Sequence, residues 1–120
     1  MKIPSPKIVV LIAVDPMKDH RAVEALRIAL GLGSHNEGMD VSIILSGCAP
    51  FLLAEDTSDI VDGEILEKHL PVFIEWGTSF SIAADADVPP LYIKDCRTAP
   101  ISLSDIAATL ELADRVLVFS

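Results

Sequence analysis

The residues best suited to chemistry in this sequence are two cysteines, Cys48 and Cys96. Each comes shortly after an apolar segment typical of a β-strand, Val41–Ser46 before Cys48 and Leu91–Ile93 before Cys96. Open α/β sheets bind ligands and do chemistry at the carboxyl ends of their strands. Both thiols are therefore candidate catalytic residues at that edge, although neither belongs to a CxxC motif.

Cys96 is the stronger candidate, because its neighbours favour a reactive thiolate. An adjacent cation and a helix N-terminus both lower a thiol pKa. Arg97 supplies the cation, and a helix is expected to begin after Ser102 or Ser104. Asp95 acts in the opposite direction. The bland alternative is an incidental, half-exposed thiol.

Cys48 is the weaker candidate. It follows Gly47, which permits a tight turn at the strand end, and buried cysteine commonly serves as a small apolar residue. A disulfide between Cys48 and Cys96 stays open, since spacing alone does not give the geometry that the bond requires.

No other motif points to a metal, a cofactor or a phosphate. His20, His35 and His69 are scattered, and no His, Cys and carboxylate spacing matches a known metal site. The P-loop, the GxGxxG fingerprint and the nucleophile elbow are all missing from the sequence. Asp15, at the end of the first strand, is explained by a role as a helix cap. We therefore expect neither a metal nor a cofactor.

Composition limits the possible partners. The chain has 120 residues, 51% of them hydrophobic, and a formal net charge of −9. Nucleic-acid affinity depends on clustered Lys and Arg, so we expect no binding to nucleic acid or to anionic membranes. The longest apolar run, Ile8–Val14, is too short to cross a bilayer and lacks the features of a signal peptide. We expect one domain over residues 1–120 and a cytoplasmic location.

Hydrophobic periodicity then places these residues on a fold. Continuous apolar runs favour strands buried on both faces of a parallel sheet. The pattern predicts a three-layer, Rossmann-like α/β domain with a mostly parallel sheet of four to five strands. The expected strands are Lys7–Val14, Val41–Leu45, Ser79–Ala84, Leu91–Ile93 and Arg115–Phe119, and the expected helices are Arg21–Leu32, Glu64–Trp76 and one after Ser102 or Ser104.

Three segments carry more specific expectations. The six residues Asp85–Pro90 are too few for a parallel crossover, so Leu91–Ile93 should be a short extended piece or an antiparallel edge. Pro71 should kink or divide its helix. The helix Arg21–Leu32 has a wider apolar side than one sheet face requires, which indicates contact with another helix or another subunit. The irregular stretch 47–62 has the length of a binding loop.

With this layout, the chain resembles the DsrE/DsrF-like family of small sulfur-handling proteins. The likeness lies in residues 7–47 (strand, Ala/Leu-rich helix, second strand), in Gly47–Leu53 (a turn before a short apolar helix) and in Ile101–Ser120 (the closing helix and strand). It implies a Rossmann-like domain that forms homotrimers or homohexamers. In active members a loop cysteine accepts a persulfide sulfur from a donor protein and passes it to an acceptor protein.

The family cysteine usually ends the third strand, where this chain has Ser81–Asp85 and no cysteine. Cys96, a little later, is the candidate substitute. Some members lack the cysteine and act as assembly subunits. Two hypotheses follow: a sulfur-relay protein using Cys96, with Cys48 as the lesser candidate, or a non-catalytic binding or assembly subunit.

The first third of the chain is also similar to the universal stress proteins. Members that bind ATP have a Gly-rich phosphate loop late in the chain, whereas no glycine occurs from Asp85 to Ser120. A nucleotide-binding role therefore ranks below both other hypotheses.

Overall fold

Five parallel strands form one sheet in the order β4-β3-β2-β1-β5. The structure is a computed structural model that describes residues 6–120. Its strands are β1 (Ile8–Ile12), β2 (Val41–Leu45), β3 (Ser79–Ala83), β4 (Arg97–Ile101) and β5 (Arg115–Phe119), and its helices are α1 (Arg21–Gly33), the 3₁₀ helix η1 (Ala49–Leu53), α2 (Gly63–Trp76) and α3 (Leu103–Leu112).

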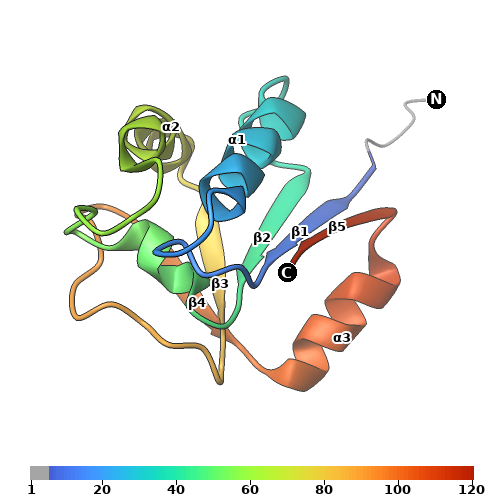
Figure 1. Ribbon diagram of the computed structural model, residues 1–120. Coiled ribbons are helices and arrows are strands. Elements are labelled where there is room, and N and C mark those ends of the chain that lie inside the picture. The colour runs from blue at the N-terminus through green and yellow to red at the C-terminus, as the bar shows by residue number, and fades with distance from the viewer. Residues whose placement is uncertain (1–5) are drawn as a thin grey trace.

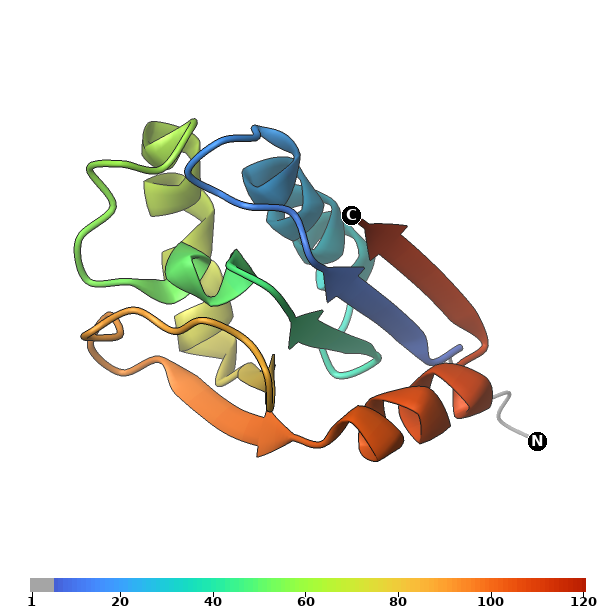
Figure 2. The ribbon, with the colours of Figure 1, turned by 60° about the horizontal axis from the view of Figure 1, so that its bottom comes forward.

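The helices lie on both faces of the sheet. α1, α2 and η1 cover one face, and α3 lies on the other (Figures 1 and 2). This division follows from the strand order: β1-α1-β2 and β2-α2-β3 step one way across the sheet, while β4-α3-β5 returns the other way. Right-handed crossovers running in opposite directions place their helices on opposite faces. The predicted α/β class and its mostly parallel sheet are confirmed.

The core lies between the sheet and the pair α1 and α2. Alternate residues of the central strands point into it, among them Val10, Ile12 and Ile43. Aromatic rings close the end near α2, where Phe73 lies 5.6 Å from Trp76 and 5.7 Å from Phe80, both edge to face. α1 packs against α2, so the extra apolar surface of α1 meets a helix, one of the two alternatives expected.

The other face of the sheet is poorly covered. None of the ten residues of α3 is buried, and its Leu103 and Leu112 are 59% and 79% exposed. On β5, Leu117 and Phe119 pack against the core, while Val118, on the opposite side of the strand, is 56% exposed. The α3 and β5 face therefore presents apolar side chains to solvent.

Leu91–Ile93 is a short extended piece outside the sheet, one of the two alternatives expected, and its Tyr92 forms an isolated antiparallel bridge with Ala54. The fourth strand is instead β4, which pairs in parallel with β3. The connection between them, residues 84–96, contains no helix. It is nevertheless long enough for the parallel crossover that six residues could not make.

Two residues of α2, Pro71 and Gly77, show how single residues affect the course of a helix. The alternative that a second helix starts at Pro71 is wrong, because α2 runs as one α-helix through Pro71, and the kink stays a prediction. Pro71 is exposed, and on that side water can bond the Glu67 carbonyl that proline leaves without its helical partner. Gly77 ends α2 as expected, with a left-handed φ of 74° and its N–H donating to Ile74 O.

Within residues 6–120, no helix combines the length and the apolar character that crossing a membrane requires.

Candidate functional site

Cys48 lies where the sequence predicted, just past the carboxyl end of β2. Gly47 makes the turn with a left-handed φ of 59°, and a Cβ there would come within 3.3 Å of Ala13 O. The turn is tied to the loop after β3, because Asp87 N donates to Gly47 O at 2.8 Å. The Cys48 thiol in turn donates to Asp87 Oδ2 at 3.6 Å.

The surroundings of Cys48 hold it in the thiol form. Burial raises its pKa most, and the Asp15 carboxylate and the Asp87 hydrogen bond raise it further, against a smaller lowering by Lys18. Two carboxylates facing one thiol oppose a second negative charge. The site therefore lacks the cationic environment that activates catalytic cysteines.

Cys96 is not where the sequence predicted. It comes immediately before β4, and Arg97 is aligned with Ser79, the first residue of β3. Cys96 thus lies at the amino edge of the sheet, while Cys48 lies at the carboxyl edge. Five residues of strand, about 16 Å, separate the two edges. A disulfide requires Cα atoms within about 7 Å, so the alternative of a Cys48–Cys96 bond is wrong, and both thiols are free.

The predicted activation of Cys96 is also wrong. The side chain packs against the hydrophobic core, and burial raises its pKa to about 11. β4 lies between Cys96 and the N-terminus of α3, so the helix dipole does not act at close range. Arg97 extends towards Gly77, where an added Cβ would lie 3.9 Å from its Nη1. The sequence shows that Cys96 and Arg97 are adjacent, but not the direction in which the Arg97 side chain extends.

A cavity of about 510 Å³ lies near Cys48 at the carboxyl side of the sheet. Its walls come from the β1–α1 loop with Met17, from η1 with Phe51, from the loop containing Ile60, and from the β3–β4 loop with Leu91. In both ribbon views the loop after η1 and the β3–β4 loop run side by side. Ligands of open α/β sheets bind on this side.

Backbone hydrogen bonds fix these walls to one another. Glu55 N donates to Leu91 O at 3.0 Å, and Ile93 N donates to Leu53 O at 2.7 Å. Val61 N donates to Pro16 O at 2.9 Å. Each bond joins two different walls, so the cavity is held open by main-chain contacts rather than by side-chain packing alone.

Asp15 and Asp19 shape the turn that leads into α1. Asp15 Oδ1 accepts from Met17 N at 2.9 Å, which orients the Met17 wall of the cavity. It does not cap α1, which begins only at Arg21. Asp19 Oδ1 accepts from Arg21 N at 2.9 Å.

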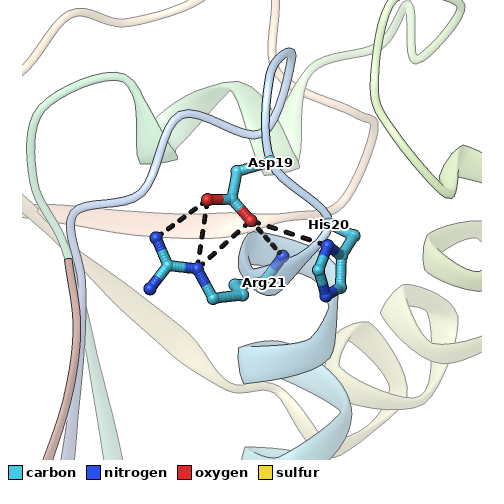
Figure 3. A network of polar contacts seen from close by, with 3 residues as sticks. All are labelled: Asp19, His20 and Arg21. Carbon is cyan, nitrogen blue, oxygen red and sulfur yellow. Dashed lines mark hydrogen bonds and ion pairs between the residues drawn. The ribbon is translucent and has the colours of Figure 1, made fainter.

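The Asp19 carboxylate also binds the Arg21 side chain, with Nη2 at 2.8 Å, and lies 3.7 Å from His20 Nδ1 (Figure 3). The hydrogen bonds from Arg21 lower the Asp19 pKa to about 2. This arrangement fixes the first turn of α1 next to the carboxyl edge.

The three histidines lie apart. His20 is near Asp19, His35 Nε2 is 3.7 Å from Asp40 Oδ2, and His69 Nδ1 is 2.8 Å from Ile65 O. In residues 6–120, no group of three or more His, Cys, Asp or Glu side chains is arranged to hold a metal ion.

Sequence reasoning missed Lys18 and Asp87 beside Cys48. A signal for Asp87 was present: Asp85-Ala86-Asp87 follows β3 directly, and the rule that selected Cys48 applies equally to polar residues at that strand end. Nothing local singled out Lys18.

No family model and no curated protein matches the sequence significantly. Among solved structures, the chain is similar to the ychN protein from E. coli, with a TM-score of 0.71 and 17% sequence identity. The match covers 96% of this chain and 100% of that chain. At this identity the likeness shows the fold alone, and ychN is a protein of DsrE-like fold.

Proposed function

We propose that this chain is a non-catalytic subunit of DsrE-like fold that assembles with further copies of itself through the α3 and β5 face. The observation that carries the proposal is the exposure of α3: none of its residues 103–112 is buried, although six of these ten residues are apolar. A helix with an apolar side normally covers it.

The exposed side chains can supply the required free energy. Fully burying a leucine or valine contributes about 1.5–3 kcal/mol. Leu112 has 79% of its surface left to bury, which corresponds to about 1–2 kcal/mol in each copy. Leu103, Val116 and Val118 add to the same face. A second copy is the chosen occupant because closed homo-oligomers are the commonest assemblies, and because the DsrE resemblance implies a trimer or hexamer.

The two thiols support a non-catalytic role. Cys96 has a pKa of about 11 through burial, and the pKa of Cys48 is raised by burial and by Asp15 and Asp87. A persulfide carrier needs a thiolate as its nucleophile, and neither environment favours one near neutral pH.

Sedimentation velocity at micromolar concentration tests the assembly. The unmodified chain is expected as a trimer or hexamer, and Leu112→Glu is expected to dissociate towards monomer because it would bury an unpaired charge. The matched control is Ile65→Glu on α2, which is also exposed but lies on the other face of the sheet. A clean monomer before substitution, or equal effects of the two variants, would overturn the proposal.

A sulfur relay is the second candidate function, favoured by the position of Cys48 at the carboxyl edge. Asp87 Oδ2 is placed to accept the thiol proton. The Cys48 thiolate would attack the outer sulfur of a donor persulfide, form a Cys48 persulfide and release the donor thiolate. An acceptor thiolate would then take the same outer sulfur. The relay would work between donor and acceptor proteins in a reducing cytoplasm, where cysteines stay free and do not form disulfides.

Intact-mass measurement after incubation with a sulfur donor separates the two candidate functions. The non-catalytic proposal expects no added sulfur. Added sulfur that disappears in Cys48→Ser assigns the relay to Cys48, and loss in Cys96→Ser assigns it to Cys96. Either result would replace the non-catalytic proposal.

A further inference from the structure

We propose that the cavity between Met17, Phe51 and Leu91 binds a small organic cation with an apolar body. The inference goes beyond the assembly role, because the cavity lies at the carboxyl edge of the sheet and shares no residue with the α3 and β5 face. The two proposals can therefore fail independently.

The interior of the cavity is apolar and of ligand size. Its volume of about 510 Å³ falls within the range of roughly 300–1,000 Å³ that small-molecule sites occupy. Met17, Phe51, Ile60 and Leu91 line it together with two prolines, Pro89 and Pro90. Phe51 offers an aromatic ring, and the prolines stiffen the opposite wall because their φ angles are fixed.

The polar groups of the cavity all carry the same charge. Glu55, Asp56 and Asp59 contribute to the lining, and no Lys, Arg or His does. Within residues 6–120, none of the three carboxylates forms an ion pair. Asp56 Oδ1 accepts from Ser58 N at 3.0 Å, which orients that carboxylate and lowers its pKa.

Charge complementarity selects the ligand. Three carboxylates beside an apolar surface attract a cation and repel an anion, while the Phe51 ring and the aliphatic walls require an apolar body. Aromatic faces also attract cations. An alkyl or aryl amine meets both requirements, whereas a bare metal ion leaves the apolar walls unused and an organic phosphate or carboxylate is repelled.

The cavity is also pre-formed. The three hydrogen bonds that join its walls are main-chain bonds, so their geometry does not depend on a ligand. Binding to a pre-formed site avoids the entropy of ordering a loop.

Three probes of similar shape and different charge test the inference by NMR titration of the full chain at low ionic strength: 2-phenylethylamine, 2-phenylethanol and phenylacetate. The amine is expected to bind about three- to fivefold more tightly than the alcohol, the ratio that one exposed ion pair of about 0.7–1 kcal/mol supplies. Phenylacetate is expected to bind most weakly. Shifted amide signals should cluster at Met17, Phe51 and Leu91.

Two classes of variant separate the charge from the apolar surface. Glu55→Gln, Asp56→Asn and Asp59→Asn combined should bring the amine to the affinity of the alcohol. Glu75→Gln, which removes an exposed carboxylate outside the cavity, should change nothing beyond a small general charge effect. Phe51→Ala should weaken all three probes together. If Phe51→Ala fails to fold, the carboxylate variants still decide the question.

Equal binding of the amine and the alcohol would overturn the inference, as would shifted signals elsewhere on the molecule. Binding of a Phe-Lys dipeptide amide without binding of 2-phenylethylamine would also overturn it, and would assign the cavity to a basic segment of a partner protein. The sedimentation result for Leu112→Glu is unaffected by any of these outcomes.

Discussion

The reactivity of Cys96 offers a direct test of the reasoning about the two thiols. The experiment measures alkylation by iodoacetamide in Cys48→Ser, where Cys96 is the remaining thiol, as a function of pH. An unstructured cysteine peptide serves as the reference. Burial raises the Cys96 pKa from an ordinary 9.0 to about 11, and the thiolate is the reactive form.

The expected rate follows from two opposing effects. At pH 8 a thiol of pKa 9.0 is about one-tenth thiolate, and one of pKa 11 about one-thousandth, a difference of roughly 100-fold. A thiolate of higher pKa is a better nucleophile, with a Brønsted coefficient of about 0.4–0.5, which returns roughly eightfold. Cys96 should therefore react about tenfold more slowly than the peptide at pH 8, before any loss from restricted access.

The pH profile is the sharper signature. The Cys96 rate should rise about tenfold for each pH unit between pH 7 and 10 and level off only near pH 11. A plateau below pH 9, or a rate at pH 8 equal to that of the peptide, would refute the burial argument and return Cys96 to the list of candidate catalytic residues.

Cys48 provides a comparison in Cys96→Ser. Asp87→Asn removes a hydrogen bond and a charge that raise the Cys48 pKa, so Cys48 alkylation at pH 8 should accelerate. Cys96 lies at the opposite edge of the sheet. Measured in the Cys48→Ser variant, it should react at the same rate whether residue 87 is Asp or Asn. Equal acceleration of both thiols would mean that the substitution had loosened the fold as a whole.

Three stability measurements test other parts of the structure. Phe73→Ala removes a fully buried ring that contacts two aromatic neighbours, and should lower the free energy of unfolding in urea by about 3–5 kcal/mol. Gly77→Ala places a side chain at φ 74° and should lower the free energy of unfolding by about 1–2 kcal/mol. The control Gly31→Ala, in open space within α1, should instead raise it by about 0.5–1 kcal/mol. A loss of stability at both sites would contradict the argument from backbone conformation. Asp19 has a folded pKa of about 2 against an ordinary 3.8, so its stabilisation is present above about pH 4 and is lost as pH falls through 2. Asp19→Asn should therefore lower Tm at pH 6 and much less at pH 2, and a Tm difference that is constant with pH would exclude the linkage.

The sequence predicted those elements that have a clear apolar pattern. Ile8–Ile12 is a continuous apolar run, and Val41–Leu45 is apolar except at Ser42, because both strands are central in a parallel sheet, where such runs are typical. α1 was located within one residue because its buried alanines and leucines recur with helical spacing. Composition and periodicity indicate which residues are apolar along each segment, so these predictions did not depend on residues distant in the chain.

β4 was not predicted because its sequence, RTAPI, has no apolar pattern. Four of its five residues are exposed, and Pro100 argues against a central strand. At the edge of the sheet, however, a proline is tolerated because one side of the strand has no partner. The nearby apolar residues Leu91–Ile93 gave the stronger local signal, although they close the cavity rather than join the sheet.

The error at Cys96 followed directly from that strand. A strand at Leu91–Ile93 would place Cys96 at its carboxyl end. The strand in the structure, β4, begins immediately after Cys96 and therefore places the thiol at the amino edge of the sheet. The sequence indicated one wall of the cavity, in the stretch 47–62, but not the cavity as a whole, because its walls are loops brought together by hydrogen bonds between residues far apart in sequence, such as Val61 and Pro16.

The pairing of β1 with β5 has a consequence for how the protein is made. Ile8 of β1 is aligned with Arg115 of β5, so one partner is synthesised long before the other. At 5–20 residues per second, the ribosome needs about 5–20 s to travel between them. During that time β1 can pair with β2, and β2 with β3. The side of β1 that will meet β5 stays unpaired, however, and an apolar strand with an open edge can template aggregation. Fast synthesis of the C-terminal third and an early chaperone encounter should both increase the yield of folded protein.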